Sequence, residues 1–173
     1  MKRLFLLRHA KSSWANTGQP DRDRPLNARG RTAAPLIGSY LRAHDYRPDL
    51  VLCSPAVRAR QTLELVLTEA GWMPQVAYDP DLYPGDPDRV FGRIRDVEES
   101  IESLLAVGHN PGWQELALAL SGSGGPADLR RLREKFPTAG LAILSFPDRT
   151  WKTVARGRGA LTAFVTPKDL AQS

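Results

Sequence analysis

The sequence has little sulfur and no long apolar run, and both absences narrow the class of protein. Its 173 residues include a single cysteine, Cys53, so no internal disulfide can form and a reducing compartment fits best. The apolar run that begins at Leu4 ends at Arg8, which is too soon for a membrane span or a signal peptide. We therefore expect an intact cytoplasmic protein with no membrane partner.

Signatures of metal, nucleotide and cysteine chemistry are also missing. The three histidines come without paired cysteines or a His-x-x-x-His spacing, and there is no Gly-x-x-x-x-Gly-Lys run for a nucleotide phosphate loop. A cysteine-dependent phosphatase needs Cys, five residues and then Arg, but that position after Cys53 is Ala59. We expect no metal and no cofactor, and we interpret Cys53 as a buried thiol at a strand end.

Acidic residues are in the minority. Lys and Arg number 24 against 19 Asp and Glu, which gives a net charge of +5 and a surface that attracts anions. The basic residues are spread along the chain without a nucleic-acid motif, so a phosphorylated protein or a small phosphate ester is favoured over nucleic acid. We interpret Arg130, Arg131 and Arg133 as a solvated face, with recruitment of an acidic phosphoprotein as the alternative. Nothing in the sequence indicates the oligomeric state.

Short apolar runs alternate with helical patterns, and no linker divides the chain. Strands are expected at residues 2–7, 50–53, 75–78, 103–107, 140–146 and 160–165. Helices are expected at 28–43 behind the cap Asn27, at 56–70, at 87–96 behind the cap Asp86, and at 112–120. We expect Pro35 to kink or shorten the first helix, Ser54-Pro55 to open the second, and 121–126 to be a loop.

This alternation predicts an α/β fold. We expect one domain over residues 1–173, a three-layer α/β/α sandwich around a mostly parallel central sheet, with a late antiparallel strand.

Polar side chains directly follow three of the expected strands. Arg8 and His9 follow the first strand, the segment from Ser54 to Arg58 follows the second, and His109 follows the fourth. Because ligand sites of parallel sheets form outside the carboxyl ends of the strands, we expect these groups to meet at one sheet edge.

Two histidines and two arginines at one edge suit phosphoryl chemistry. The planar guanidinium of arginine matches phosphate oxygens with two parallel hydrogen bonds and stays charged at any working pH. A histidine ring nitrogen can accept a phosphoryl group, which divides one displacement into two easier ones. Positioning and electrostatic stabilisation are then the main tasks of the protein, and neither requires a metal.

Three segments carry a family resemblance. They are Arg8-His9-Ala10-Lys11-Ser12, the run Ser-Pro-Ala-Val-Arg-Ala-Arg-Gln-Thr at 54–62, and Gly108-His109-Asn110-Pro111. These resemble the signatures of the histidine phosphatase superfamily (branch 1). The short chain and the segment Asp23-Arg24-Pro25-Leu26-Asn27 resemble its phosphohistidine phosphatase SixA group. The resemblance covers nearly the whole chain and implies a phosphoglycerate mutase-like fold.

The resemblance also implies roles for individual residues. His9 matches the family nucleophile, Arg8 and Arg58 match its phosphate-binding arginines, and His109 matches the histidine that contacts the transferred phosphoryl group. Arg24 matches a family arginine near the pocket. The implied activity is a metal-independent phosphohydrolase that forms a phosphohistidine intermediate on His9.

Two positions depart from the family pattern or leave it open. Phosphoglycerate mutases of this superfamily carry an asparagine just after the tryptophan that corresponds to Trp14, whereas this chain has Ala15 there. Asp81 lies roughly where related enzymes place a general acid, with Asp79 close by and Asp86 better explained as a helix cap. The sequence therefore leaves open which residue would protonate a leaving alkoxide.

The absence of a clearly assigned general acid affects which substrate we expect. Imidazole is a far better leaving group than an alkoxide, so a phosphohistidine substrate needs a dedicated acid less than an ester does. We therefore expect a phosphohistidine-containing protein as the substrate. A small-molecule phosphomonoester and a non-catalytic phosphate-sensing module are the alternatives.

Overall fold

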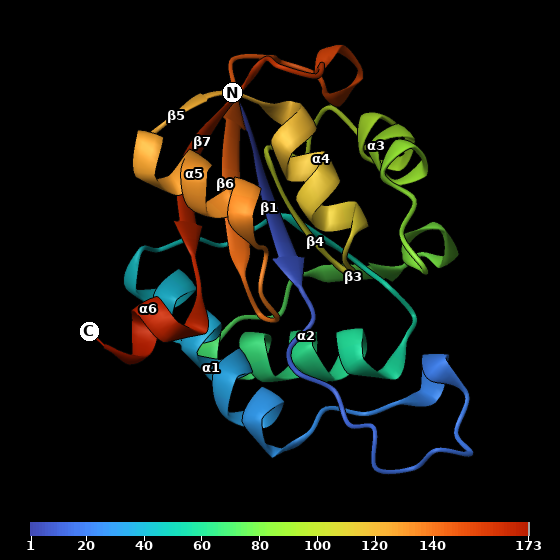
Figure 1. The fold of residues 1–173 in the computed structure, drawn as a ribbon. Coiled ribbons are helices and arrows are strands. Elements are labelled where there is room, and N and C mark those ends of the chain that lie inside the picture. The colour runs from blue at the N-terminus through green and yellow to red at the C-terminus, as the bar shows by residue number, and fades with distance from the viewer. Residues whose placement is uncertain (173) are drawn as a thin grey trace.

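The computed structural model describes residues 1–172 and places their named strands in one seven-stranded sheet of order β3-β2-β4-β1-β6-β7-β5 (Figure 1). The strands are β1 (Lys2–Arg8), β2 (Leu50–Cys53), β3 (Gln75–Tyr78), β4 (Ser103–Gly108), β5 (Ser121–Gly124), β6 (Leu141–Phe146) and β7 (Gly159–Val165). Strand β6 is antiparallel to both β1 and β7, and the other neighbouring pairs are parallel. The expected mostly parallel sheet with a late antiparallel strand is confirmed.

Helices cover both faces of this sheet (Figure 1). They are α1 (Ala28–Ala43), α2 (Val57–Ala70), α3 (Pro87–Arg95), α4 (Gly112–Leu120), α5 (Pro126–Glu134) and α6 (Pro167–Ala171). Helices α1, α2 and α6 share one core with Phe5 and Leu7 of β1, whereas α3, α4 and α5 share the other with Leu4 and Leu6. Because side chains alternate along a strand, β1 contributes to both cores. The expected three-layer α/β/α sandwich is confirmed. No helix within residues 1–172 is long and apolar enough to cross a membrane.

Helix α1 begins and ends as expected, but Pro35 does not shorten it. Asn27 caps the helix by accepting a 2.9 Å hydrogen bond from the backbone N–H of Gly30, and the helix continues for 16 residues through Pro35. Gly38 lies where α1 meets α2, so close that an added Cβ would clash with the carbonyl of Val66. Tight packing against α2 holds the helix continuous across the proline.

Two other local expectations were wrong. Helix α2 begins at Val57 with Ala56 as its cap, so Ser54-Pro55 does not open it. Its expected end at Gly71 is confirmed by a left-handed backbone there (φ 80°). The expected loop at 121–126 contains β5, because Ser121–Gly124 pairs with the edge of β7. Backbone pairing needs no apolar side chain, which is why the Gly/Ser-rich sequence gave no strand signal.

The sheet order brings three strand ends together. Strands β2, β4 and β1 are neighbours, and their register sets Cys53 opposite Val107 and Arg8 opposite Gly108. The backbone N–H of His9 donates to the Gly108 carbonyl at 3.0 Å, which extends the ladder by one residue beyond β1. The three polar groups expected at one sheet edge therefore lie there.

Substitutions of two glycines test whether the loop after β1 packs tightly against the start of α1. A Cβ added at Gly30 would clash with the carbonyl oxygen of Lys11, whereas one added at Gly92, an exposed position in α3, would meet nothing within 4 Å. We expect Gly30→Ala to lower the free energy of unfolding by about 1–3 kcal/mol through overpacking. Gly92→Ala should raise it by about 0.5–1 kcal/mol through helix propensity. Urea denaturation measures both, and equal effects of the two substitutions would contradict this account.

Candidate active site

The strand-end pocket has a volume of about 330 Å³ and lies at the carboxyl ends of β1, β2 and β4. Five of the residues that the sequence singled out line it: Arg8, His9, Arg24, Arg58 and His109. The rest of the lining consists of Lys11, Ser12, Trp14, Asn110 and Thr138. The structure thus brings together the predicted histidines and arginines.

His9 is held with one ring nitrogen occupied and the other available. Its Nδ1 lies 2.7 Å from the carbonyl oxygen of Ala10. Because a carbonyl can only accept, Nδ1 carries the proton and Nε2 carries the lone pair. A neutral imidazole with a free Nε2 is the form that can act as a nucleophile.

Burial and neighbouring charge keep both histidines neutral. Burial, together with the positive charges of Arg58 and Arg8, lowers the pKa of His9 to about 4, although the hydrogen bond to the Ala10 carbonyl opposes the shift. Burial, together with the charges of His9 and Arg58, likewise lowers the pKa of His109 to about 3. The rings lie with centroids 5.2 Å apart, so a positive charge on either one would repel the other.

Ser54 is the partner of His109, a role that the sequence did not reveal. Its hydroxyl oxygen lies 2.7 Å from Nε2 of His109 and accepts a 3.2 Å hydrogen bond from the backbone N–H of Ala56. Ser54 is fully buried, and among the described residues its hydroxyl proton has no acceptor other than Nε2 of His109, so we infer that the hydroxyl donates to Nε2. The Nδ1 of His109 then carries the ring proton and can donate to a bound oxyanion.

Asp21 joins the arginines of the pocket and was also missed. Its carboxylate accepts from Arg58 Nη2 at 3.0 Å, from Arg24 Nε at 3.1 Å and from the Tyr83 hydroxyl at 2.7 Å. The Tyr83 hydrogen bond and the two guanidinium groups hold the pKa of Asp21 well below its usual range. Asp21 is therefore ionised at neutral pH and supplies a fixed countercharge to two arginines.

The remaining arginine contacts fix the walls of the pocket. The guanidinium of Arg24 lies 3.5 Å from the ring centroid of the exposed Trp14 and donates to the Ser12 hydroxyl at 2.7 Å. Arg8 donates through Nη1 to the carbonyl of Phe136 at 2.8 Å. Among residues 1–172, the buried side-chain nitrogens that lack a partner are Arg8 Nε, Arg58 Nε, His109 Nδ1 and Trp72 Nε1. The first three belong to residues of the strand-end pocket, where a bound anion could satisfy them.

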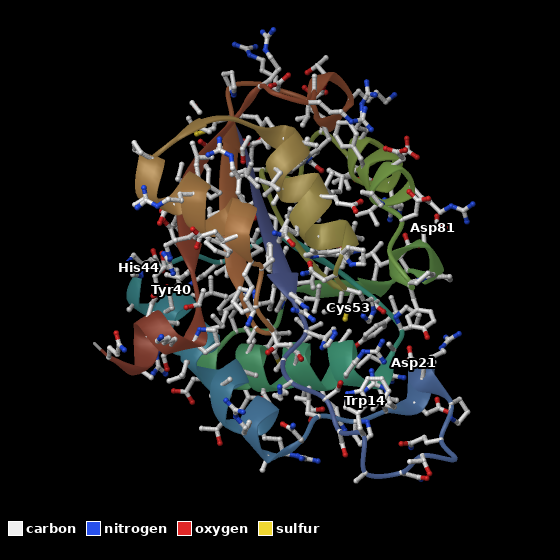
Figure 2. The ribbon with its side chains drawn as sticks, in the orientation of Figure 1. Trp14, Asp21, Tyr40, His44, Cys53 and Asp81 are labelled. Atoms are coloured by element: carbon white, nitrogen blue, oxygen red, sulfur yellow. The ribbon has the colours of Figure 1, made fainter. Side chains whose placement is uncertain are left out.

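The structure does not bring Asp81 into the pocket lining. It lies in the short helix η2 (Pro80–Leu82), about half exposed, with Arg89 Nη1 at 3.6 Å from its carboxylate. Figure 2 shows Asp81 well apart from Trp14 and Asp21. Asp79 caps η2 and pairs with Arg93, and Asp86 caps α3 as expected. The lining contains no carboxylate among the described residues, and Asp21 at its border is ionised.

Two other sequence observations have structural counterparts. The residue after Ala15 is an asparagine, Asn16, but it accepts a 3.2 Å hydrogen bond from the backbone N–H of Gly18 within its own turn and does not line the pocket. It therefore does not replace the asparagine missing at Ala15. Burial raises the pKa of the Cys53 thiol to about 12, which agrees with an inert thiol in the core (Figure 2). Within residues 1–172, no three His, Cys, Asp or Glu side chains are grouped to hold a metal ion.

Comparison with known proteins places the chain in a family. A sequence model of the histidine phosphatase superfamily (branch 1) matches residues 4–115, and the chain belongs to this superfamily. A Mycobacterium tuberculosis (strain H37Rv) protein of undetermined function is 40% identical over 164 residues, which cover 94% of this chain and 100% of that relative. The phosphohistidine phosphatase SixA of Escherichia coli K12 is 30% identical over 110 residues, or 62% of this chain and 67% of that protein.

Within the superfamily, the structural neighbours include SixA proteins. A provisionally assigned phosphohistidine phosphatase SixA from Agrobacterium tumefaciens has a TM-score of 0.80 at 33% identity and covers 96% of this chain and 98% of its own. A protein histidine phosphatase SixA complexed with tungstate has a TM-score of 0.79 at 25% identity, with 97% and 99% covered. The phosphoglycerate mutase-like fold is therefore confirmed, and the group it resembles in detail is SixA.

The Ser54 contact predicts a change in the His109 tautomer. In Ser54→Ala, Nε2 of His109 loses its donor, so the proton is free to move between the two ring nitrogens. We expect ¹⁵N NMR of the histidine rings to show the Nδ1-protonated form in the parent protein and a mixture in the variant. Turnover should fall about tenfold with little change in KM, since one oriented donor is lost. An unchanged ¹⁵N pattern would contradict the assigned direction of this hydrogen bond.

The neutral histidine pair predicts a pH-dependent stability. Between pH values of about 6.5 and 4, the unfolded chain takes up protons at His9 and His109 that the folded protein does not. The free energy of unfolding should therefore fall as the pH falls through this window, by at most about 1.4 kcal/mol per pH unit for each histidine. Urea denaturation of His109→Gln should show a shallower slope than the parent protein, and an equal slope would contradict the lowered pKa of His109.

Proposed function

We propose that this protein is a single-domain cytoplasmic phosphohydrolase that forms a phosphohistidine intermediate on His9 and takes its phosphoryl group from a phosphohistidine-containing protein. One observation carries the proposal. The Nδ1 of His9 donates to the Ala10 carbonyl, which leaves the Nε2 lone pair free in a pocket lined by Arg8, Arg58 and His109. The membership in the histidine phosphatase superfamily supports the phosphatase class.

In the first step, Nε2 of His9 attacks phosphorus while the bond from phosphorus to the leaving atom of the substrate breaks. The electron pair of that bond goes to the leaving atom, which for phosphohistidine is an imidazole nitrogen. Arg8, Arg58 and the Nδ1 proton of His109 stabilise the charge on the three phosphoryl oxygens. In the second step, the oxygen of a water molecule bonds to phosphorus while the bond from phosphorus to Nε2 of His9 breaks and its electron pair returns to Nε2. The product leaves as dihydrogen phosphate, which keeps both protons of the water.

We propose a phosphohistidine substrate because the pocket formed within residues 1–172 lacks a general acid. Hydrolysis of an ester expels an alkoxide that needs a proton, but the described lining of the pocket has no carboxylic acid and Asp21 is ionised. A phosphohistidine substrate releases imidazole and avoids this need. The likeness to SixA proteins supports the same choice, and the tungstate complex of one of them supports binding of a tetrahedral oxyanion.

A substrate panel tests this proposal. We expect kcat/KM for a phosphohistidine protein to exceed that for para-nitrophenyl phosphate and for sugar phosphates, because the good leaving group compensates for the absent acid. A preference for alkyl esters would favour the small-molecule phosphomonoesterase. Binding of phosphate with no turnover of any substrate would favour a phosphate-sensing module.

Variants of the pocket test the intermediate. His9→Ala should lower kcat by at least about a thousandfold and abolish the acid-labile, alkali-stable phosphoenzyme trapped by rapid quenching. Arg58→Ala should lower kcat/KM by about 10²–10³-fold. Arg60→Ala is the matched control, because Arg60 is exposed on the same helix, lies over the ring of Tyr78 and does not line the pocket. Equal phosphate release by His9→Ala and the parent protein would contradict the mechanism.

A further inference from the structure

A second hollow, which we call the basic groove, adjoins the strand-end pocket. It has a volume of about 490 Å³ and lies between the first turn of α1, the segment before β6 and the start of α6. Lys11 and Thr138 line both the groove and the pocket, so the two lie side by side. An extended chain whose phosphorylated side chain enters the pocket would therefore have the groove beside it.

The groove is lined by cations without acids. Lys11, Arg29, Lys135 and Lys168 line it, and its described lining includes no Asp or Glu. All four side chains are exposed, and none of them forms an ion pair among the described residues. Four uncompensated charges of one sign around a concave surface create a positive potential that attracts anions.

The Arg130–Arg133 cluster differs from this groove. Arg131 pairs with Asp128 and Asp169 and donates to the Phe164 carbonyl, so its charge is already compensated. The interpretation of this cluster as a solvated face holds for Arg130 and Arg133, which are both exposed on α5. The free positive charge next to the pocket thus comes from the groove.

Helix α1 adds to the positive potential. The amino terminus of a helix carries a partial positive charge and usually has acidic residues in its first turn. The first turn of α1 contains no acid, and it includes Arg29 instead. The sequence therefore places a cation where the helix itself disfavours one, at the position that lines the groove.

The wall of the groove is fixed to the catalytic residues. Lys135 is followed by Phe136, whose carbonyl accepts from Arg8 Nη1 at 2.8 Å and from Asn110 Nδ2 at 3.1 Å. Ala139 then donates its backbone N–H to the carbonyl of His9 at 3.0 Å. Because these bonds hold the segment against the pocket, the backbone that carries Lys135 stays next to the phosphoryl site.

We propose that the basic groove binds an acidic segment of the phosphoprotein substrate, next in its chain to the phosphohistidine, and thereby selects among substrates. This inference rests on the proposed function. The described groove lining has no aromatic side chain on which a nucleic-acid base could stack, which favours a carboxylate-rich peptide over a nucleic acid. A small phosphate ester would fill the pocket alone and gain nothing from the groove.

A pair of peptides tests the proposal. Both carry the same phosphohistidine, which is flanked by glutamates in one peptide and by glutamines in the other. For the parent protein at low salt, we expect kcat/KM for the acidic peptide to exceed that for the neutral one by about tenfold, and the ratio to fall as salt is added. In Lys135→Glu/Lys168→Glu, the ratio should fall to about one or below. The rate at which each variant hydrolyses para-nitrophenyl phosphate corrects the peptide rates for any change in the chemical step itself.

The matched control is Arg149→Glu/Lys152→Glu, which changes the net charge equally. These residues follow β6 at the opposite end of the sheet, where Phe146 pairs with Lys2 at the start of β1. We expect the control to keep most of the acidic preference. A ratio near one in the parent protein, or an equal loss in both double variants, would overturn the proposal.

Binding without turnover separates this inference from the proposed function. In a His9→Ala background, fluorescence anisotropy measures the affinity for the labelled acidic peptide and for an oligodeoxynucleotide of equal charge. Weaker peptide binding after Lys135→Glu/Lys168→Glu, but not after the control pair, supports the groove even if no phosphohistidine peptide is hydrolysed. If the two groove substitutions weaken only oligonucleotide binding, the occupant is a nucleic acid and the proposal is overturned.

Discussion

The backbone around His9 is held on both sides of β1, and the geometry of the site depends on this arrangement. The N–H of His9 donates to Gly108 at the end of β4, and its carbonyl accepts from Ala139 just before β6. These two hydrogen bonds restrict the backbone of His9 at the point where the chain leaves the sheet. The Ala10 carbonyl then fixes the imidazole itself. A nucleophile held in this way needs little reorganisation before it reacts.

The arginines create a problem of charge that Asp21 resolves. Arg8, Arg24 and Arg58 line one small pocket, where like charges repel and burial removes water. The Asp21 carboxylate compensates part of this charge through Arg24 and Arg58, and the Phe136 carbonyl accepts from Arg8. The histidines remain neutral under the remaining positive field. The same field that attracts a phosphoryl group thus also keeps its acceptor unprotonated.

Much of this arrangement could be predicted from the sequence, because it depends on local patterns. Buried apolar runs that stop at a polar residue marked β1, β2 and β4, and the rule for parallel sheets then brought His9, Arg58 and His109 to one edge. Asp21 and Ser54 could not be found in this way. Two of the three partners of Asp21, Arg58 and Tyr83, come from distant segments of the chain. Ser54 precedes a proline and so carries a stronger signal for a helix cap. Asp81 was suggested by resemblance alone, and side-chain packing places it beside Arg89 instead.

The long loop after β1 is closed at its base. Ser12 bridges to Leu26, the N–H of Ser13 donates to Pro25, and the N–H of Asn27 donates to Lys11, so the two arms of the loop are joined before it extends outward (Figure 1). The exposed residues near its tip lie beyond this closure. Because adding residues to a loop that is already closed costs little free energy, insertions at the tip would leave the pocket in place. The tip is therefore the part of the site where evolution could vary the shape of the entrance while the catalytic groups stay unchanged.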